Sequence, residues 1–112
     1  MDITVIQYTT KDAHSEDNAS LIRDVFDQLH FVAPKEFGYS VIELAGGHFM
    51  HVVSTSAGSD FAVTELPAFK RFQTGLSNRI DAAPSRTSAK LVGSYNGFVG
   101  QQPAAIQTDN IN

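Results

Sequence analysis

The sequence predicts an α+β domain in which two helices pack on one face of a four-stranded antiparallel sheet. Two segments with helical amphipathic spacing separate segments rich in β-branched and aromatic residues, in the order β-α-β-β-α-β of the ferredoxin-like arrangement. The chain has 112 residues, which is enough for a single hydrophobic core. A TIM barrel, or a doubly wound domain with a second domain beside it, is therefore excluded.

The first strand and the first helix are predicted from the beginning of the chain. Residues 3–10 are rich in β-branched and aromatic side chains, which is typical of a strand. A helix is expected to begin at Ser15, as its N-cap, because two carboxylates follow in the first turn. Pro34 ends this helix, since the residue before a proline is disfavoured in the α conformation. Its apolar face is expected to consist of Leu21, Ile22, Val25, Phe26 and Leu29.

A β-hairpin is predicted in the middle of the chain. Residues 37–44 and 48–54 are strand-like, and residues 45–47 between them contain two glycines that tolerate the backbone angles of a tight turn. Residues 55–64 have no periodicity and are expected to form a loop.

A second helix is predicted from Glu65 to Ile80, with Pro67 in its first turn, where a missing N–H is tolerated. Gly75 weakens this helix, so we expect a close contact at that position. The apolar face is expected to be formed by Phe69, Phe72, Leu76 and Ile80.

The last predicted strand covers residues 88–95 and completes a domain of residues 1–95. Residues 96–112 are polar and lack periodicity, so they are expected to form a C-terminal tail outside the core.

Apolar residues occupy both alternating faces of the predicted strands. In the first strand, Ile3 and Val5 point to one side, whereas Ile6 and Tyr8 point to the other. An antiparallel sheet with one solvated face normally alternates between apolar and polar side chains. The pattern therefore predicts that a second protein surface covers the other face, most simply in a homodimer.

Composition excludes several classes of partner and chemistry. Eight basic and 12 acidic side chains give a net charge of −4, and no basic cluster is present, which argues against nucleic-acid partners. No apolar run approaches the roughly 20 residues of a membrane span, and no targeting segment is recognised, so we expect a cytoplasmic protein. Cysteine is absent, which removes thiol nucleophiles and cysteine-based metal sites.

Neither a metal site nor a cofactor site is predicted. His48 and His51 are three residues apart on a strand, so their side chains point to opposite faces and cannot share one metal ion. Gly46 and Gly47 precede a strand rather than a helix, unlike a phosphate-binding loop.

Three stretches resemble the dimeric α/β barrel superfamily, in particular proteins with an antibiotic-biosynthesis-monooxygenase-like domain. These are Phe-Met-His-Val at 49–52, Glu-Leu-Pro-Ala-Phe-Lys-Arg-Phe-Gln at 65–73 and Val-Gly-Ser-Tyr at 92–95. The resemblance implies a dimer whose sheets pack face to face, with a pocket between sheet and helices in each subunit. Characterised members include cofactor-free oxygenases of polyketide quinols, haem-degrading enzymes and isomerases. The oxygenases and haem degraders typically use a pocket tryptophan, which this sequence lacks.

The candidate catalytic residues are His51 and Tyr8. A neutral imidazole on an apolar strand that faces a pocket can act as an acid or base near neutral pH, and a phenol can orient a ligand oxygen. The alternative for His51 is a buried, hydrogen-bonded structural role. The candidate ligand-binding residues are aromatic, and their alternative role is simply core packing; they are Phe49, Tyr39, Phe72, Phe69 and Phe26.

Two functions from different classes follow from these observations. The first is a homodimer that binds a small apolar or aromatic molecule between sheet and helices, with monooxygenase-like or isomerase-like chemistry and no bound metal or cofactor. The alternative is a non-enzymatic homodimeric module with a stress-related or regulatory role, in which the surface and the tail carry the function.

Overall fold

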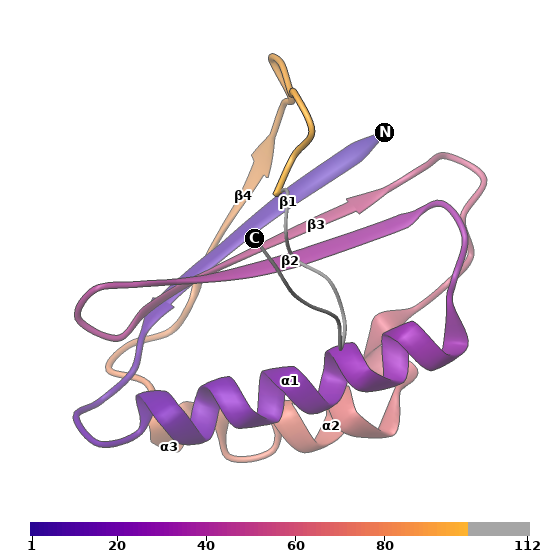
Figure 1. The fold of residues 1–112 in the computed structure, drawn as a ribbon. Helices are drawn as coiled ribbons and strands as arrows, with labels where there is room; N and C mark the ends of the chain where they lie inside the picture. Colours follow the sequence, from indigo (N-terminus) through magenta and orange to yellow (C-terminus); the bar gives the residue numbers. More distant parts are fainter. Residues whose placement is uncertain (99–112) are drawn as a thin grey trace, which may run out of the picture.

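The computed structural model describes residues 1–98, and its strands form one antiparallel sheet in the order β2-β3-β1-β4. All helices lie on one face of this sheet (Figure 1). The elements are β1 Asp2–Thr9, α1 Ser15–Val32, β2 Phe37–Leu44, β3 His48–Thr55, the 3-10 helix η1 Val63–Glu65, α2 Pro67–Gln73, α3 Leu76–Arg79 and β4 Ser85–Ala89. The predicted α+β, ferredoxin-like fold is confirmed. None of the helices within residues 1–98 is long and apolar enough to cross a membrane.

The hairpin of β2 and β3 turns at residues 45–47, as predicted. Gly46 and Gly47 both have positive φ, at 83° and 75°, which side chains rarely tolerate. The turn is also held against the end of β1, because the backbone N–H and the hydroxyl of Thr10 both donate to the Gly47 carbonyl. The register of β3 against β1 is thereby supported at this end of the sheet.

Helix α1 begins one residue earlier than expected. His14 is the N-cap and Ser15 is the first helical residue, and no side chain caps the helix. The prediction that Ser15 caps the helix was therefore wrong. The backbone N–H of Asn18 bonds to the His14 carbonyl and closes the first turn without a side-chain cap. At the other end, Ala33 adopts the left-handed conformation, with φ of 50°, immediately before Pro34.

The core lies between the sheet and the helices. Phe49 from β3 and Val25 from α1 are each only 1% exposed, and Ala68 from α2 is completely buried. Side chains from β1 and α2 complete this layer. Leu21 and Phe26, which were predicted on the apolar face of α1, are partly buried and pack against the same core.

The second predicted helix is broken in two. Helix α2 ends at Gln73, and α3 begins after Gly75, which has φ of 80°. No atom crowds this glycine, because a Cβ there would meet its nearest neighbour, Arg79 Nη1, at 3.7 Å. Gly75 therefore serves a left-handed turn rather than the close contact expected from the sequence.

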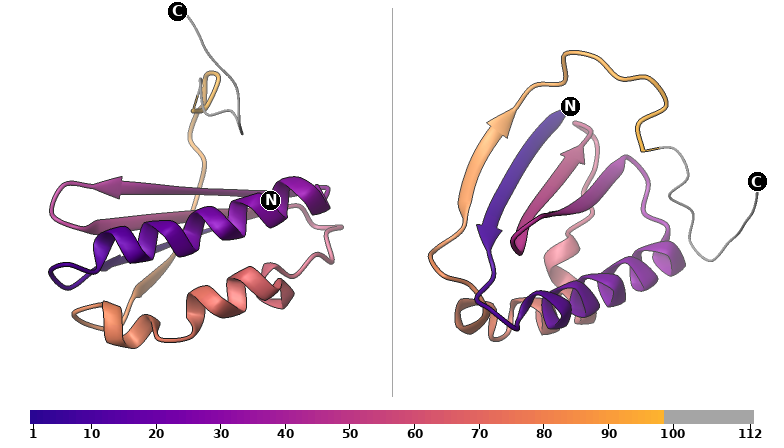
Figure 2. Two further views of the ribbon diagram at one scale, coloured as in Figure 1. Left: turned by 60° about the horizontal axis from the view of Figure 1, so that its bottom comes forward. Right: turned by 60° about the vertical axis from the view of Figure 1, so that its left-hand side comes forward.

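Strand β4 lies earlier in the chain than the predicted 88–95. It pairs with β1 from Ser85 opposite Gln7 to Ala89 opposite Ile3. Pairing stops there because β1 itself begins at Asp2. The apolar residues that suggested a later strand, including Val92 at 95% exposed, follow the paired segment. Residues 90–98 extend away from the sheet on the side opposite to the helices (Figures 1 and 2). Of the predicted tail, residues 99–112 lie outside the described residues.

The face of the sheet that points away from the helices carries a mixture of apolar and polar side chains. Val5 lies opposite Val52 across β1 and β3, and Ile42 lies opposite Met50 across β2 and β3. All four side chains are only partly buried in the single chain. We call these four residues the outer apolar patch. Its position agrees with the sequence pattern, in which both faces of each strand carry apolar residues.

Replacing Gly75 with alanine tests the broken helix. We expect Gly75→Ala to lower the free energy of unfolding by about 1–2 kcal/mol, because a Cβ is strained in the left-handed region. Gly93→Ala is the matched control, since Gly93 has an ordinary φ and open space around it. Urea unfolding of both variants measures the difference, and equal stability of the two variants would contradict the left-handed turn.

Candidate functional site

A chain of hydrogen-bonded polar side chains runs through the buried layer between the sheet and α1. Tyr39 Oη lies 2.7 Å from His51 Nδ1, and Tyr8 Oη lies 2.7 Å from His51 Nε2. Asn18 Nδ2 donates to Tyr8 Oη at 2.8 Å, and Arg79 Nε donates to Asn18 Oδ1 at 3.1 Å. We call this set of five side chains the buried polar chain. It joins β2, β3, β1, α1 and α3 in that order.

The strand register places Tyr8 and His51 under the helices. His51 lies opposite Ile6 on β1 and opposite Val41 on β2, and Tyr8 lies opposite Phe49. Residues that face each other across an antiparallel pair share one face of the sheet, so Tyr8 and His51 both point toward the helices. They are only 5% and 3% exposed.

Arg79 enters the core because α3 ends against β1. The Lys11 backbone N–H donates to the Arg79 carbonyl, and Ile80 forms a β-bridge with Thr10. The guanidinium donates to the carbonyls of Phe72 and Thr74 in addition to Asn18. Its carbon also lies 5.4 Å from the centre of the Phe72 ring. At 7% exposed, Arg79 therefore uses its donors within the protein, which is how a buried guanidinium is tolerated.

Burial decides the protonation states in the chain. It lowers the pKa of His51 to about 4, so the imidazole is neutral at neutral pH. Burial raises the pKa of Tyr8 to about 12, against an opposing effect of the Asn18 hydrogen bond. Burial also raises the pKa of Tyr39. Both phenols therefore keep their protons, and Arg79 is the charged member of the chain.

The seven candidate site residues form one cluster of contacting rings. Phe49 stacks on Tyr8, and Phe72 lies against His51, with ring centres 5.6 Å apart in both pairs. Phe69 contacts Phe72 at 5.7 Å, and Phe26 stacks on Tyr39 at 5.0 Å. The cluster thus joins His51 and Tyr8 with the five predicted aromatic side chains, which are Phe49, Tyr39, Phe72, Phe69 and Phe26.

These contacts fill the space between β3 and α2 where a ligand pocket was expected. Phe49, Phe69 and Phe72 are 1%, 9% and 4% exposed and pack as core. A ligand that contacts these three residues would have to displace side chains. These three side chains are therefore arranged as core packing, which is the alternative to ligand binding given for them above.

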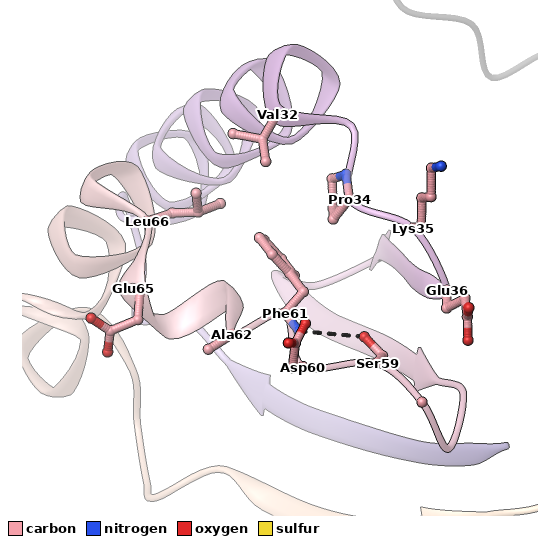
Figure 3. A pocket seen from close by; sticks show the side chains of 11 residues that line it. Val32, Pro34, Lys35, Glu36, Ser59, Asp60, Phe61, Ala62, Glu65 and Leu66 are labelled. Carbon is pink, nitrogen blue, oxygen red and sulfur yellow. Dashed lines mark hydrogen bonds between the residues drawn. The ribbon is translucent and has the colours of Figure 1, made fainter.

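A depression of about 620 Å³ lies instead at the C-terminal end of α1. The side chain of Phe61 points into it, between Val32, Pro34 and Leu66 (Figure 3). The backbone N–H of Phe61 donates weakly to the Ser59 hydroxyl at 3.5 Å. None of the seven candidate residues lines this depression.

Aromatic rings connect the depression to the buried polar chain. The Phe61 ring packs edge-on against Phe37, with centres 4.9 Å apart, and Phe37 packs edge-on against Tyr39 at 6.2 Å. Tyr39 is only partly buried, unlike Tyr8 and His51. Tyr39 is therefore the member of the polar chain that adjoins the aromatic path from the depression.

His48 lies on the opposite face of the sheet from His51, as the spacing predicted. Its Nδ1 pairs with the Thr9 hydroxyl at 2.9 Å, and its Nε2 pairs with Gln7 Oε1 at 3.0 Å. Within residues 1–98, no group of three or more potential ligands (His, Cys, Asp or Glu) is placed to hold a metal ion.

The fold resembles a set of solved structures at low sequence identity. A candidate antibiotic biosynthesis monooxygenase from Nitrosomonas europaea aligns with a TM-score of 0.69 and 10% identity, over 83% of this chain and all of that one. A second antibiotic biosynthesis monooxygenase aligns at 0.64 with 13% identity, over 83% of this chain and all of that one. A conserved protein from Methanosarcina mazei aligns with a TM-score of 0.62 and 14% identity, over 80% of this chain and 92% of that one. The sequence matches no protein-family model and no curated protein.

The chain has an antibiotic-biosynthesis-monooxygenase-like fold. This agrees with the resemblance drawn from the sequence. At 10–14% identity, the monooxygenase-like fold establishes the architecture and leaves the chemistry to the residues of the site.

Two members of the polar chain were missed at the sequence level. Asn18 lies four residues before Ile22 and seven before Val25, so it falls on the apolar face of α1, where a polar residue signals a buried partner. Arg79 was not among the residues predicted on the apolar face of residues 65–80, although it follows Phe72 by seven residues and would share its face in a continuous helix. The turn at Gly75 and the bridge between Ile80 and Thr10 set where its side chain enters the core, and local spacing gives no signal of either contact.

The buried, neutral His51 predicts a specific pH dependence of stability. The unfolded imidazole has a pKa near 6.5 and binds a proton first as the pH falls, whereas the folded one binds it only near pH 4. We therefore expect about 3 kcal/mol of stability to be lost between pH 6.5 and 4. His51→Gln lacks this titration and should show a shallower slope over the same interval. Urea unfolding at each pH measures both slopes, and parallel slopes would contradict the assignment.

Proposed function

We propose that the chain is a homodimeric protein that binds a small, largely apolar, aromatic molecule between the helices and the sheet. The observation that carries this proposal is the path of rings from Phe61 through Phe37 to Tyr39, which links the depression to the buried polar chain. Apolar walls with a few convergent polar groups are typical of small-molecule sites. A ligand that enters at Phe61 would displace these contacting rings to reach the phenol of Tyr39.

The roles of the candidate residues differ from one another in this proposal. His51 has both ring nitrogens engaged by phenols, and its low pKa makes it a poor base at neutral pH. His51 and Tyr8 thus act through Tyr39 rather than on the ligand directly. Phe26 stacks on Tyr39 and holds its ring, while Phe49, Phe69 and Phe72 support the imidazole and Tyr8 from beneath.

Monooxygenase-like chemistry is the reaction class that we propose to test. It is supported by the monooxygenase-like fold and by a site that offers phenol and imidazole groups. The alternative is a non-enzymatic homodimeric module. The observation in its support is the set of exposed apolar side chains in residues 91–98, which form a surface suited to contact another protein. We retain a cytoplasmic location as part of the proposal.

The homodimer is supported by the outer apolar patch of Val5, Ile42, Met50 and Val52. A second copy that presents the same patch would remove these side chains from water, at about 25 cal/mol for each Å² of apolar surface. His48, Gln7 and Thr9 beside the patch are hydrogen-bonded to one another, so they can be covered with few unpaired groups.

Ligand binding is tested with naphthalene as an apolar aromatic probe. We expect chemical-shift changes in the NMR resonances of Phe61, Phe37 and Tyr39, and at least tenfold weaker binding to Phe61→Asp, because a charge would occupy the apolar entrance. Phe31→Asp is the matched control, since Phe31 is 90% exposed on α1 and lies outside the depression. Equal binding to all three proteins would contradict the proposed entrance.

The same samples separate the enzymatic proposal from its alternative. With 1,4-dihydroxynaphthalene as substrate, a monooxygenase-like enzyme should consume oxygen faster than the uncatalysed reaction. One oxygen atom enters the product, a hydroxynaphthoquinone, and the other leaves as water, with the quinol itself supplying the electrons. Mass spectrometry detects that insertion. Binding of naphthalene without oxygen uptake would instead support a binding module.

The homodimer predicts a mass of about twice the 12.2 kDa chain in sedimentation at micromolar concentration. Val52→Glu places a charge in the outer apolar patch and should shift the protein to the monomer. Phe31→Glu introduces the same charge on the helical side and should leave the dimer intact. A monomeric wild-type protein would contradict the proposed assembly.

A further inference from the structure

The three rings at the centre of the buried polar chain carry one more proton than their mutual hydrogen bonds can use. Tyr39 and Tyr8 each carry one hydroxyl proton, and neutral His51 carries one N–H. Only two hydrogen bonds join these three side chains. One proton is therefore left over, and its position decides which group can donate to a ligand.

Arg79 fixes the direction of the chain from its other end. A guanidinium can only donate, so the Asn18 atom that it contacts must be the amide oxygen. The Asn18 amide nitrogen then faces Tyr8 and donates to its hydroxyl oxygen. The Arg79 bonds to the backbone carbonyls of Phe72 and Thr74 keep the guanidinium in this orientation.

Two arrangements of the remaining protons satisfy these contacts, and they differ in which phenol is left with an unused proton. If His51 carried its proton on Nε2, Tyr8 would accept from both Asn18 and His51, and its own proton would be unpaired at a site only 5% exposed. If His51 carries its proton on Nδ1, Tyr8 donates to Nε2, Nδ1 donates to Tyr39, and the unused proton is on Tyr39. Tyr39 is partly buried as a residue and adjoins the aromatic path, so the second arrangement places the unused proton on the ring nearest to that path.

We propose that the hydroxyl of Tyr39 is the ligand-contacting donor at the end of a directed chain, Arg79 to Asn18 to Tyr8 to His51 to Tyr39, and that it selects aromatic ligands carrying a carbonyl or another acceptor oxygen. This inference rests on the ligand site proposed above. Tyr39 contacts the ligand, and Asn18 and Arg79 are positioning residues that act through the chain.

The positive charge of Arg79 makes the Tyr39 hydroxyl a stronger hydrogen-bond donor. Successive donors polarise one another in a medium of low dielectric constant, so a cation at one end strengthens donation at the other. A ligand oxygen that gains negative charge is stabilised by the Tyr39 proton. A ligand with only donor groups, or with none, leaves that proton without an acceptor among the residues that the structure describes.

The tautomer of His51 tests the direction of the chain without any ligand. We expect ¹⁵N NMR of the wild-type protein to show the proton on Nδ1. Asn18→Asp changes one group and leaves the shape nearly unchanged, but a carboxylate only accepts, so Tyr8 must donate to it and His51 should switch its proton to Nε2. Arg79→Lys keeps a donor and should preserve the wild-type tautomer. A proton on Nε2 in the wild type, or no switch in a folded Asn18→Asp variant, would overturn the proposal.

Ligand selection is tested with two probes of nearly equal shape, 2-acetylnaphthalene and 2-isopropylnaphthalene. We expect the wild type to bind the acetyl compound about tenfold more tightly, the difference typical of one hydrogen bond. Tyr39→Phe should abolish this preference and leave the binding of the isopropyl compound within about twofold. Equal binding of both probes by the wild type would overturn the selection by Tyr39 while leaving the proposed aromatic site intact. Binding of neither probe would overturn both.

Discussion

The buried guanidinium of Arg79 is the interaction on which the arrangement of the site depends. It donates to Asn18 on α1 and to two carbonyls at the end of α2, and its own backbone carbonyl accepts from Lys11 after β1. One residue thus joins the end of β1 to both helical segments, through its side chain and its backbone carbonyl. Because a buried charge without partners is strongly unfavourable, these contacts have to form together, which restricts α1, α2 and the end of β1 to one relative position.

This constraint explains why the helical layer is irregular. A continuous helix through residues 65–80 would carry Arg79 on the same face as Phe72, because seven residues separate them. The left-handed turn at Gly75 redirects the chain before that point, so that α3 ends beside β1. The turn also leaves the Phe72 and Thr74 carbonyls without helical N–H partners. The guanidinium donates hydrogen bonds to both of them. The carbonyls freed by the break and the buried guanidinium are therefore hydrogen-bond partners of each other.

The sequence was sufficient for the features that depend on local periodicity. Alternation placed His48 and His51 on opposite faces, and the two glycines located the hairpin, because both follow from backbone geometry over a few residues. The fourth strand was predicted too late in the chain, at residues 88–95 rather than Ser85–Ala89. Its position depends on where β1 begins rather than on its own apolar residues. The contacts of Arg79 were beyond prediction for the same reason, since they require the direction of a turn and the ends of three distant elements.

The two faces of the sheet are coupled through single strands. In β3, His51 belongs to the buried polar chain, whereas its neighbour Val52 belongs to the outer apolar patch. A shift of one residue in the register would exchange these two side chains between the faces of the sheet. The polar imidazole would then lie in the outer apolar patch, and the Tyr8 hydroxyl would lose its His51 partner. Burial of the patch against a second copy would therefore favour the same register that the polar chain needs on the other side. Assembly and site would then stabilise one arrangement of β3, and the position of His51 would depend on contacts made on the face from which it points away.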